Sequence, residues 1–112
     1  MSATVKGTLA SEPRPAGGAV VLVATFHTTP ERRGELRRRL LEMVELTRAE
    51  RGCLRYDLHD DLDDGQRFVF VETWADEAAL NMHMTTSHVG ALLQDVPQLT
   101  TRDIDLVRLR AI

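Results

Sequence analysis

The side chains best suited to chemistry near neutral pH are two histidines in the segment His83-Met84-Thr85-Thr86-Ser87-His88. An unperturbed imidazole has a pKa of about 6.5, so it can accept or donate a proton under physiological conditions. His83 is the first choice for a catalytic base or proton relay, and His88 is the second. The alternative for each is a structural imidazole that hydrogen-bonds backbone at a break between two short helices. The spacing alone does not decide which of the two would act as the base.

Glu72 is the third catalytic candidate, because a carboxylate near such histidines can take part in proton transfer. It lies in one of two predicted strands, and in the pairing that places Arg55 opposite Glu72 these two side chains form an ion pair. That pair can equally be structural, orienting the strands or a dimer. One sheet face then carries Cys53, Arg55, Asp57, His59, Phe68, Phe70, Glu72 and Trp74.

Five residues are predicted to bind substrate at this face. A solvated face does not normally gather several aromatic side chains, so we expect it to be covered, by a second copy of the chain. Trp74 would then form a wall for an aromatic ligand or anchor the dimer, and His27 ends the polar stripe of the first strand. The predicted substrate-binding set is His27, Arg55, Asp57, Phe70 and Trp74.

No metal site is expected from the spacing of these residues. His83 and His88 are five residues apart across a helix break, whereas ligands on one helix face are three or four apart. The single cysteine, Cys53, excludes an internal disulfide and a thiolate zinc cluster. The acidic run from Asp60 to Gly65 lacks the ligand spacing of a calcium loop and is predicted to be a hairpin turn.

The elements that position these side chains follow from hydrophobic periodicity. Alternating apolar residues predict a first strand over 20–28, and a Thr28–Glu31 capping box predicts the start of a helix that Gly52 ends. Strands over 53–60 and 67–74, a helix from Asp76 to about residue 84, a further helical segment ended by Pro97, and a last strand over 101–109 follow. This order is typical of an α+β, ferredoxin-like sheet with helices on one face.

Length and charge set the remaining limits. A chain of 112 residues with a net charge of −3 is a single domain without the basic character of a nucleic-acid-binding protein. Residues 1–18 contain prolines and glycines without apolar periodicity and are predicted to be a flexible tail, with the domain over 19–112. The longest apolar run has six residues, so no membrane span is expected, and a cytoplasmic protein is predicted.

Several segments resemble the antibiotic biosynthesis monooxygenase family. They are Gly52 to Leu58, Phe68 to Leu80 with its Glu72-Thr73-Trp74, and the His83–His88 segment, and the resemblance extends over about 20–109. It implies a homodimeric α/β barrel. Ser87 departs from the family pattern, in which proline often precedes the second histidine, and the lack of a tryptophan over 80–84 argues against haem degradation.

The resemblance implies oxidation of an aromatic quinol or polyketide-type substrate by dioxygen, without flavin, haem or metal. Such a reaction requires that the protein supply a base, hydrogen-bond donors for the resulting oxyanion and a cavity from which water is excluded. Two alternatives remain open. One is an isomerase or proton-transfer enzyme acting on a small phosphorylated ketone related to autoinducer-2 breakdown, and the other is a non-catalytic, ligand-binding stress-response barrel.

Overall fold

The structure of the protein is a computed structural model that describes residues 18–112. The predicted tail over 1–18 lies outside the described residues except for its last position. The elements run in the order β1 (Val20–His27), α1 (Arg33–Arg48), β2 (Cys53–Asp60), β3 (Arg67–Trp74), α2 (Glu77–Met84), α3 (Ser87–Asp95), a 3₁₀ turn (Val96–Gln98) and β4 (Asp105–Leu109).

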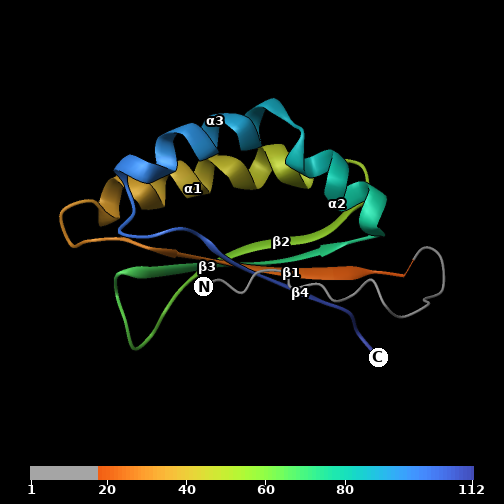
Figure 1. Cartoon of the computed structure of the whole chain (residues 1–112), viewed down its shortest axis with the longest axis horizontal. Helices are drawn as coiled ribbons and strands as arrows, with labels where there is room; N and C mark the ends of the chain where they lie inside the picture. Colours follow the sequence, from red (N-terminus) through yellow and green to blue (C-terminus); the bar gives the residue numbers. More distant parts are fainter. Residues whose placement is uncertain (1–17) are drawn as a thin grey trace.

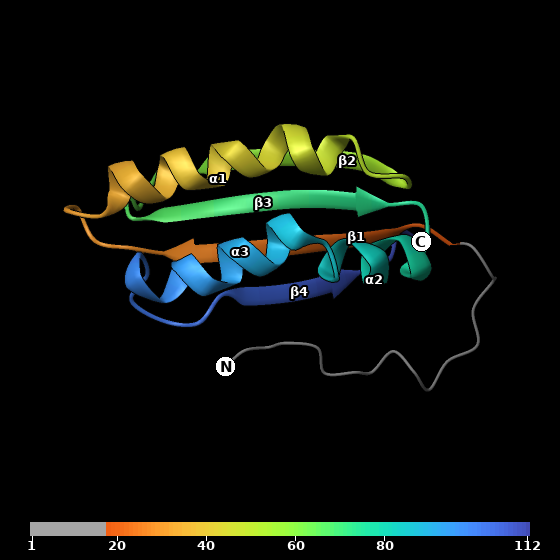
Figure 2. The same ribbon diagram turned by 90° about the horizontal axis from the view of Figure 1, so that it is seen from above.

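The four strands form one antiparallel sheet in the order β2-β3-β1-β4. All three α-helices lie over the same face of this sheet, with α1 above the β2–β3 side and α2 and α3 above the β1–β4 side (Figures 1 and 2). The predicted α+β, ferredoxin-like architecture is confirmed. None of the helices between residues 18 and 112 combines the length and the apolar character needed to cross a membrane.

The core lies between the helices and the sheet. In β1 every second side chain, from Val20 to Phe26, is buried, as the alternation predicts. The helix α1 contributes the predicted stripe, in which Leu36, Leu40 and Met43 are almost completely buried. The β2 and β3 bounds agree with the prediction residue for residue, and β4 begins four residues later than expected.

The predicted capping box at the start of the first helix is wrong. The Thr28 hydroxyl donates to the Leu99 carbonyl at 2.6 Å, so it ties the end of β1 to the segment before β4. Instead, the Arg32 backbone N–H donates to the Thr29 hydroxyl at 3.2 Å, and the α-helix begins at Arg33. A threonine that finds a tertiary partner is no longer available as a local cap.

The predicted pairing of β2 with β3 is also wrong by one residue. Tyr56, not Arg55, lies opposite Glu72, because the register shifts between Cys53 and Arg55. Such an irregularity places one extra residue on β2 and changes which side chains share a face. In the pairing of β3 with β1, Trp74 lies opposite Val20 and Glu72 lies opposite Leu22, so these β3 side chains share the buried face of β1.

The aromatic side of β3 therefore faces the protein's own helices and not a second molecule. Phe68, Phe70, Glu72 and Trp74 are all buried within one protomer. The opposite sheet face carries a row of three valines, in which Val23 of β1 lies between Val71 of β3 and Val107 of β4. Val107 is 42% exposed in the single chain.

Candidate active site

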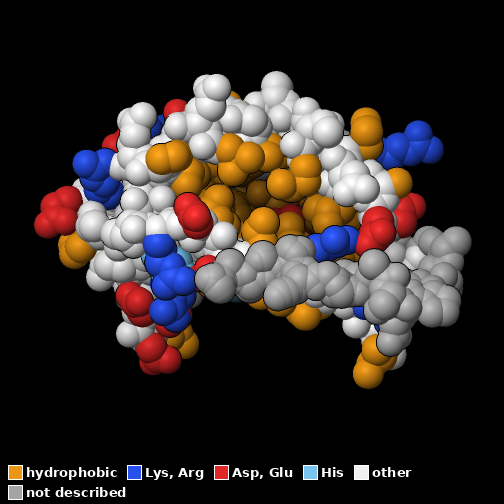
Figure 3. Space-filling model, in the orientation of Figure 1, with side chains coloured by type: hydrophobic (Ala, Val, Ile, Leu, Met, Phe, Trp, Pro, Cys, Tyr) orange, Lys and Arg blue, Asp and Glu red, His pale blue; other side chains and the backbone are white. Residues whose placement is uncertain are grey.

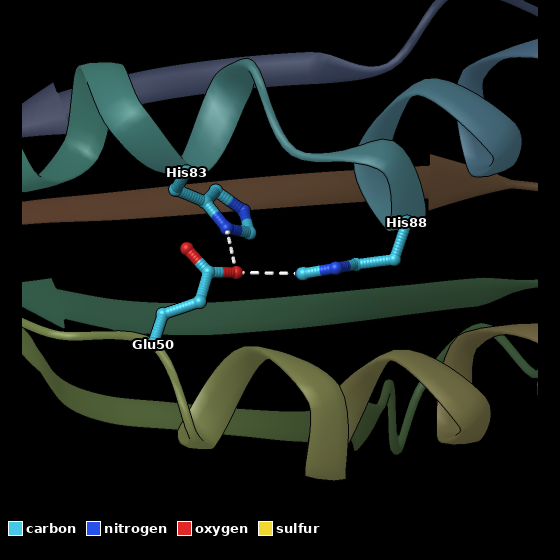
Figure 4. A group of neighbouring side chains, drawn as sticks. All are labelled: Glu50, His83 and His88. Atoms are coloured by element: carbon cyan, nitrogen blue, oxygen red, sulfur yellow. Dashed lines mark hydrogen bonds and ion pairs between the residues drawn. The ribbon is translucent and has the colours of Figure 1, made fainter.

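Glu50 joins the two predicted histidines into one cluster. Its Oε2 atom lies 2.8 Å from Nδ1 of His83 and 2.6 Å from Nε2 of His88. The three side chains come from three segments and point toward one another between the helix layer and the sheet (Figure 4). All three are largely shielded, with side-chain exposures of 14% for Glu50, 5% for His83 and 17% for His88. The structure thus brings together both histidines with a carboxylate that the sequence analysis did not single out.

A tight turn after α1 places Glu50. Its backbone N–H donates to the Thr47 carbonyl at 2.9 Å, and its carbonyl accepts from the Cys53 N–H at 3.2 Å. Gly52 completes the turn with a φ of +87°, and a Cβ atom there would lie 2.5 Å from the Ala79 Cβ atom. This residue therefore has both a backbone conformation and a close approach to α2 that favour glycine.

Thr86 holds the corner at which α2 gives way to α3. Its hydroxyl donates to the His83 carbonyl at 2.8 Å and accepts from the Val89 N–H at 3.4 Å. One side chain therefore caps α3 and fixes the end of α2, as the predicted break at Thr85-Thr86-Ser87 requires. The two histidines, although five residues apart, are turned toward the same point by this corner.

Aromatic rings surround the His83 imidazole. The Trp74 ring centroid lies 4.6 Å from that of His83, and the Tyr56 centroid lies 5.8 Å away in an edge-on arrangement. Tyr56 in turn stacks on Phe70 at 4.4 Å. These contacts restrict the orientation of the imidazole and keep most water away from it, and Trp74 and Phe70 are two of the predicted substrate-binding residues.

The hydrogen bond to Glu50 assigns the protonated nitrogen of His83. A carboxylate only accepts, so Nδ1 of His83 carries the proton that it donates to Glu50. The Nε2 atom of a neutral His83 then holds the lone pair. Burial lowers the pKa of His83 from its ordinary value, and the hydrogen bond that His83 donates to Glu50 partly opposes this effect. A neutral imidazole oriented by a carboxylate is the arrangement of a general base.

Glu72 is buried beside this cluster but belongs to a different pair. Its Oε1 atom accepts from the Trp74 indole N–H at 2.9 Å. Burial raises the pKa of Glu72 to about 7, the hydrogen bond from Trp74 opposes that shift, and the negative charge of Glu50 adds to it. The carboxyl group is therefore poised to change its protonation state near neutral pH.

A pocket of about 470 Å³ opens next to Glu50. Its lining is mostly apolar and comes from the turn after α1 and from α2 with its flanks: Glu50, Arg51, Gly52, Ala75, Asp76, Ala78, Ala79, Met82, Thr85 and Thr86. Hydrophobic side chains also gather around a hollow between the helix layer and the sheet, on the side of the molecule that carries α3 and β4 (Figure 3). A small ligand can thus approach the Glu50 carboxylate.

The other predicted substrate-binding residues lie away from the cluster. His27 is on the opposite face of the sheet, where its Nε2 atom lies 2.8 Å from an Asp105 oxygen. Arg55 does not pair with Glu72; its Nε atom donates to Asp57 at 2.6 Å, and Arg48 donates to the same carboxylate at 2.9 Å. This surface ion-pair network holds the pKa of Asp57 below its usual range, chiefly through Arg55.

Comparisons with known proteins agree with this architecture. The family model described as antibiotic biosynthesis monooxygenase matches residues 19–95. The Bacillus subtilis protein named "Putative monooxygenase YcnE" is 34% identical over 89 residues, which cover 80% of this chain and 94% of that protein. The Mycobacterium tuberculosis protein named "Putative monooxygenase Rv0793" is 35% identical over 85 residues, which cover 76% of this chain and 83% of that protein.

Solved structures give the same result. The structure of Rv0793 superimposes with a TM-score of 0.80 at 33% identity, covering 84% of this chain and 95% of that one. The crystal structure of PA3566 from Pseudomonas aeruginosa also gives a TM-score of 0.80, at 32% identity, covering 88% of this chain and 99% of that one. With its sheet, its helices and most of its length matched in this way, the chain belongs to the antibiotic biosynthesis monooxygenase family.

Proposed function

We propose that the protein is a monooxygenase that oxidises an aromatic quinol or polyketide-type phenol with dioxygen, using His83 as the base and no flavin, haem or metal for the reaction. The observation that carries this proposal is the shielded His83 imidazole, whose Nδ1 atom is tied to Glu50 at 2.8 Å. That tie leaves Nε2 free to accept a proton. Family membership and the names of the two relatives support the reaction class.

For an anthrone, the overall reaction replaces the two hydrogens of a ring CH₂ group by one oxygen atom and releases water. Nε2 of His83 takes the first proton, and the resulting anion passes an electron to dioxygen. The two radicals combine into a C–O bond, and the peroxide takes the proton back from His83. Loss of the second C–H proton to His83 breaks the O–O bond, and the departing hydroxide takes this proton to become water.

Glu50 acts in this scheme as a positioning residue. Its negative charge stabilises the imidazolium that forms each time His83 takes a proton, and its hydrogen bond holds the ring in one orientation. Trp74 packs against the same imidazole, and its indole N–H holds the Glu72 carboxyl group, so Trp74 separates two titratable groups. Glu72 serves as a second proton carrier near neutral pH. His88 is the second donor to Glu50.

The protein is also proposed to act as a homodimer, assembled through the sheet face that the helices leave uncovered. The row Val71, Val23 and Val107 crosses three strands of this face. An apolar sheet face of this kind is a suitable surface for a two-fold symmetric contact. Two sheets packed in this way would form the eight-stranded barrel that the family resemblance implies.

Dioxygen uptake with simple hydroquinones and anthrones tests the proposal. The wild-type protein, purified without flavin or metal, is expected to consume one dioxygen molecule for each substrate molecule. His83→Gln should slow the reaction by at least about 100-fold, the lower end of what a general base contributes. His59→Gln is the matched control, because His59 is exposed, lies outside the cluster and is hydrogen-bonded through its Nδ1 atom to the Val69 carbonyl.

Two outcomes would contradict the proposal. One is indifference to every electron-rich phenol tested, with ligands changing the melting temperature and no product appearing, which would favour a binding protein. The other is turnover of a phosphorylated ketone under anaerobic conditions, which would favour the isomerase.

A further inference from the structure

We propose that Glu50, His83 and His88 form a binding site for one divalent transition-metal ion of the Zn²⁺ type, and that the bound ion switches off His83 as a base. One ligand atom from each of these three side chains lies within 4.8 Å of the other two. The sequence argument against a metal was the five-residue spacing of the histidines. The structure removes that argument, because the corner at Thr86 turns both imidazoles toward the same carboxylate oxygen.

The donor set fits a borderline transition metal. Two imidazole nitrogens and one carboxylate oxygen, with a further position open, form the ligand set of many zinc sites. Bonds of about 2.0–2.2 Å to a tetrahedral ion place ligand atoms roughly 3.3–3.5 Å apart. The distances of 2.8 Å and 2.6 Å from the Glu50 oxygen to the two nitrogens would open by less than about 1 Å, which small side-chain rotations can supply.

The surroundings of the three side chains also favour an ion. Tyr56 and Trp74 restrict the His83 ring, so little conformational freedom remains to be lost on binding. The pocket of about 470 Å³ borders Glu50 and gives both an entry path and space for a water or a second ligand at the open position. Of the charged groups on this pocket, Asp76 attracts a cation and Arg51 repels it, while Glu72 adds a buried carboxyl group nearby.

The coupling to catalysis follows from the chemistry of the imidazole ring. A metal ion at Nδ1 of His83 takes the place of the proton that this atom donates to Glu50. A neutral ring must then carry its proton on Nε2, and this is the atom on which the proposed function depends as proton acceptor. Metal binding and proton abstraction are therefore mutually exclusive at His83.

Titration calorimetry of the full, untagged, EDTA-treated chain with Zn²⁺ tests the site without any substrate. One ion per protomer is expected to bind, and Mg²⁺ and Ca²⁺ are expected not to bind, since those ions prefer sets of oxygen ligands. Glu50→Gln and His88→Gln should each weaken the binding of Zn²⁺ at least tenfold. His59→Gln, which removes an exposed histidine outside the cluster, should leave it unchanged.

Co²⁺ provides a readout on the unmodified protein that does not depend on the folding of any variant. A site with few ligands is expected to give the intense visible absorption of four- or five-coordinate Co²⁺, which an equimolar amount of Zn²⁺ abolishes.

Three results would overturn the proposal. They are the absence of Zn²⁺ binding, Zn²⁺ binding that His59→Gln weakens as much as His88→Gln does, and a weak six-coordinate Co²⁺ spectrum. Zn²⁺ binding in a protein that never consumes dioxygen would support the metal site and contradict the proposed function instead. Oxygen uptake without Zn²⁺ binding would support the proposed function and contradict the metal site.

Discussion

At the scale of single residues, the sequence identified the histidines but not the carboxylate that joins them. His83 and His88 stand out by residue type, since an imidazole in a short polar segment suggests proton transfer. Glu50 follows a helix rich in charged residues and has no feature that separates it from Glu42 or Glu45. Its role depends on a tertiary contact 33 residues away in the chain, which periodicity does not describe.

Glu50→Gln tests the positioning role of this carboxylate. The amide keeps the size of the side chain and loses the charge that stabilises an imidazolium, so kcat for dioxygen uptake should fall roughly 10- to 100-fold, as for other residues that orient a catalytic group. Glu45→Gln is the matched control, because Glu45 is exposed on α1. Equal rates in the two variants would exclude a role for Glu50 in the proton transfer.

Glu72 predicts a pH dependence of stability. Its pKa is about 7 in the folded protein, above the value of about 4.5 of an unburied carboxyl group, so the folded state holds the proton over this interval and the unfolded state does not. Stability is therefore unaffected by this group below pH 4.5 and decreases as the pH rises toward and beyond 7. The full decrease amounts to about 3–4 kcal/mol, from about 1.4 kcal/mol for each pKa unit.

Glu72→Gln should remove this decrease, because a carboxamide does not titrate and its oxygen can still accept from the Trp74 indole N–H. Urea denaturation of both proteins at pH 4.5, 6 and 8 provides the measurement. The wild-type protein is expected to lose more free energy of unfolding than the variant between pH 4.5 and 8. Identical losses would show that Glu72 is already ionised in the folded protein at pH 4.5.

At the scale of elements, local signals determined the helices and strands, and one irregularity changed their faces. The β2 and β3 bounds follow from alternation and from the Asp64-Gly65 turn. The register shift between Cys53 and Arg55 is not visible in the sequence, and it places Tyr56 rather than Arg55 opposite Glu72. Because side chains alternate, that shift determined which β2 side chains share the face of the β3 aromatic residues, and it placed Tyr56 there instead of Arg55.

Two glycines are expected to respond to alanine in opposite directions. In Gly52→Ala, a residue with a Cβ atom must adopt a φ of +87°, and that Cβ atom lies too close to Ala79. The substitution should therefore destabilise the protein by about 1–3 kcal/mol and displace the turn that carries Glu50. Gly90→Ala in the exposed part of α3 meets nothing within 4 Å, so it should stabilise the protein by roughly 0.5–1 kcal/mol. Melting temperatures of both variants provide the check, and shifts of the same sign would contradict this account of the turn.

At the scale of the whole molecule, the two faces of the sheet are the reverse of what the sequence suggested. The helices cover the aromatic face, and the face expected to lie under the helices is uncovered. The aromatic face is enclosed within one protomer, so the shielded cluster does not need a partner to exclude water. The proposed dimer therefore depends on the valine row of the other face. The fold class was predictable because the order of elements determines it, whereas the residues of the interface depend on the register.

Val107→Lys tests this interface. The side chain is 42% exposed in the single chain, so lysine can be accommodated in a monomer, but it would place a charge within the apolar contact. Light scattering after size-exclusion chromatography should show a dimer for the wild-type protein and a largely monomeric variant at micromolar concentration. Leu46→Lys, at a 54% exposed position of α1, should remain dimeric. A monomeric wild-type protein would contradict the proposed assembly.

The most direct test of the central claim is the fate of labelled dioxygen. Flavin-free, metal-free protein is incubated with an anthrone under ¹⁸O₂, and product and water are analysed by mass spectrometry. The account predicts one ¹⁸O atom in each product molecule and one in water, at a rate that His83→Gln lowers at least about 100-fold. Two results would contradict the account. One is that ¹⁸O enters product and water no faster than it does without protein. The other is that His83→Gln leaves the rate of labelling unchanged.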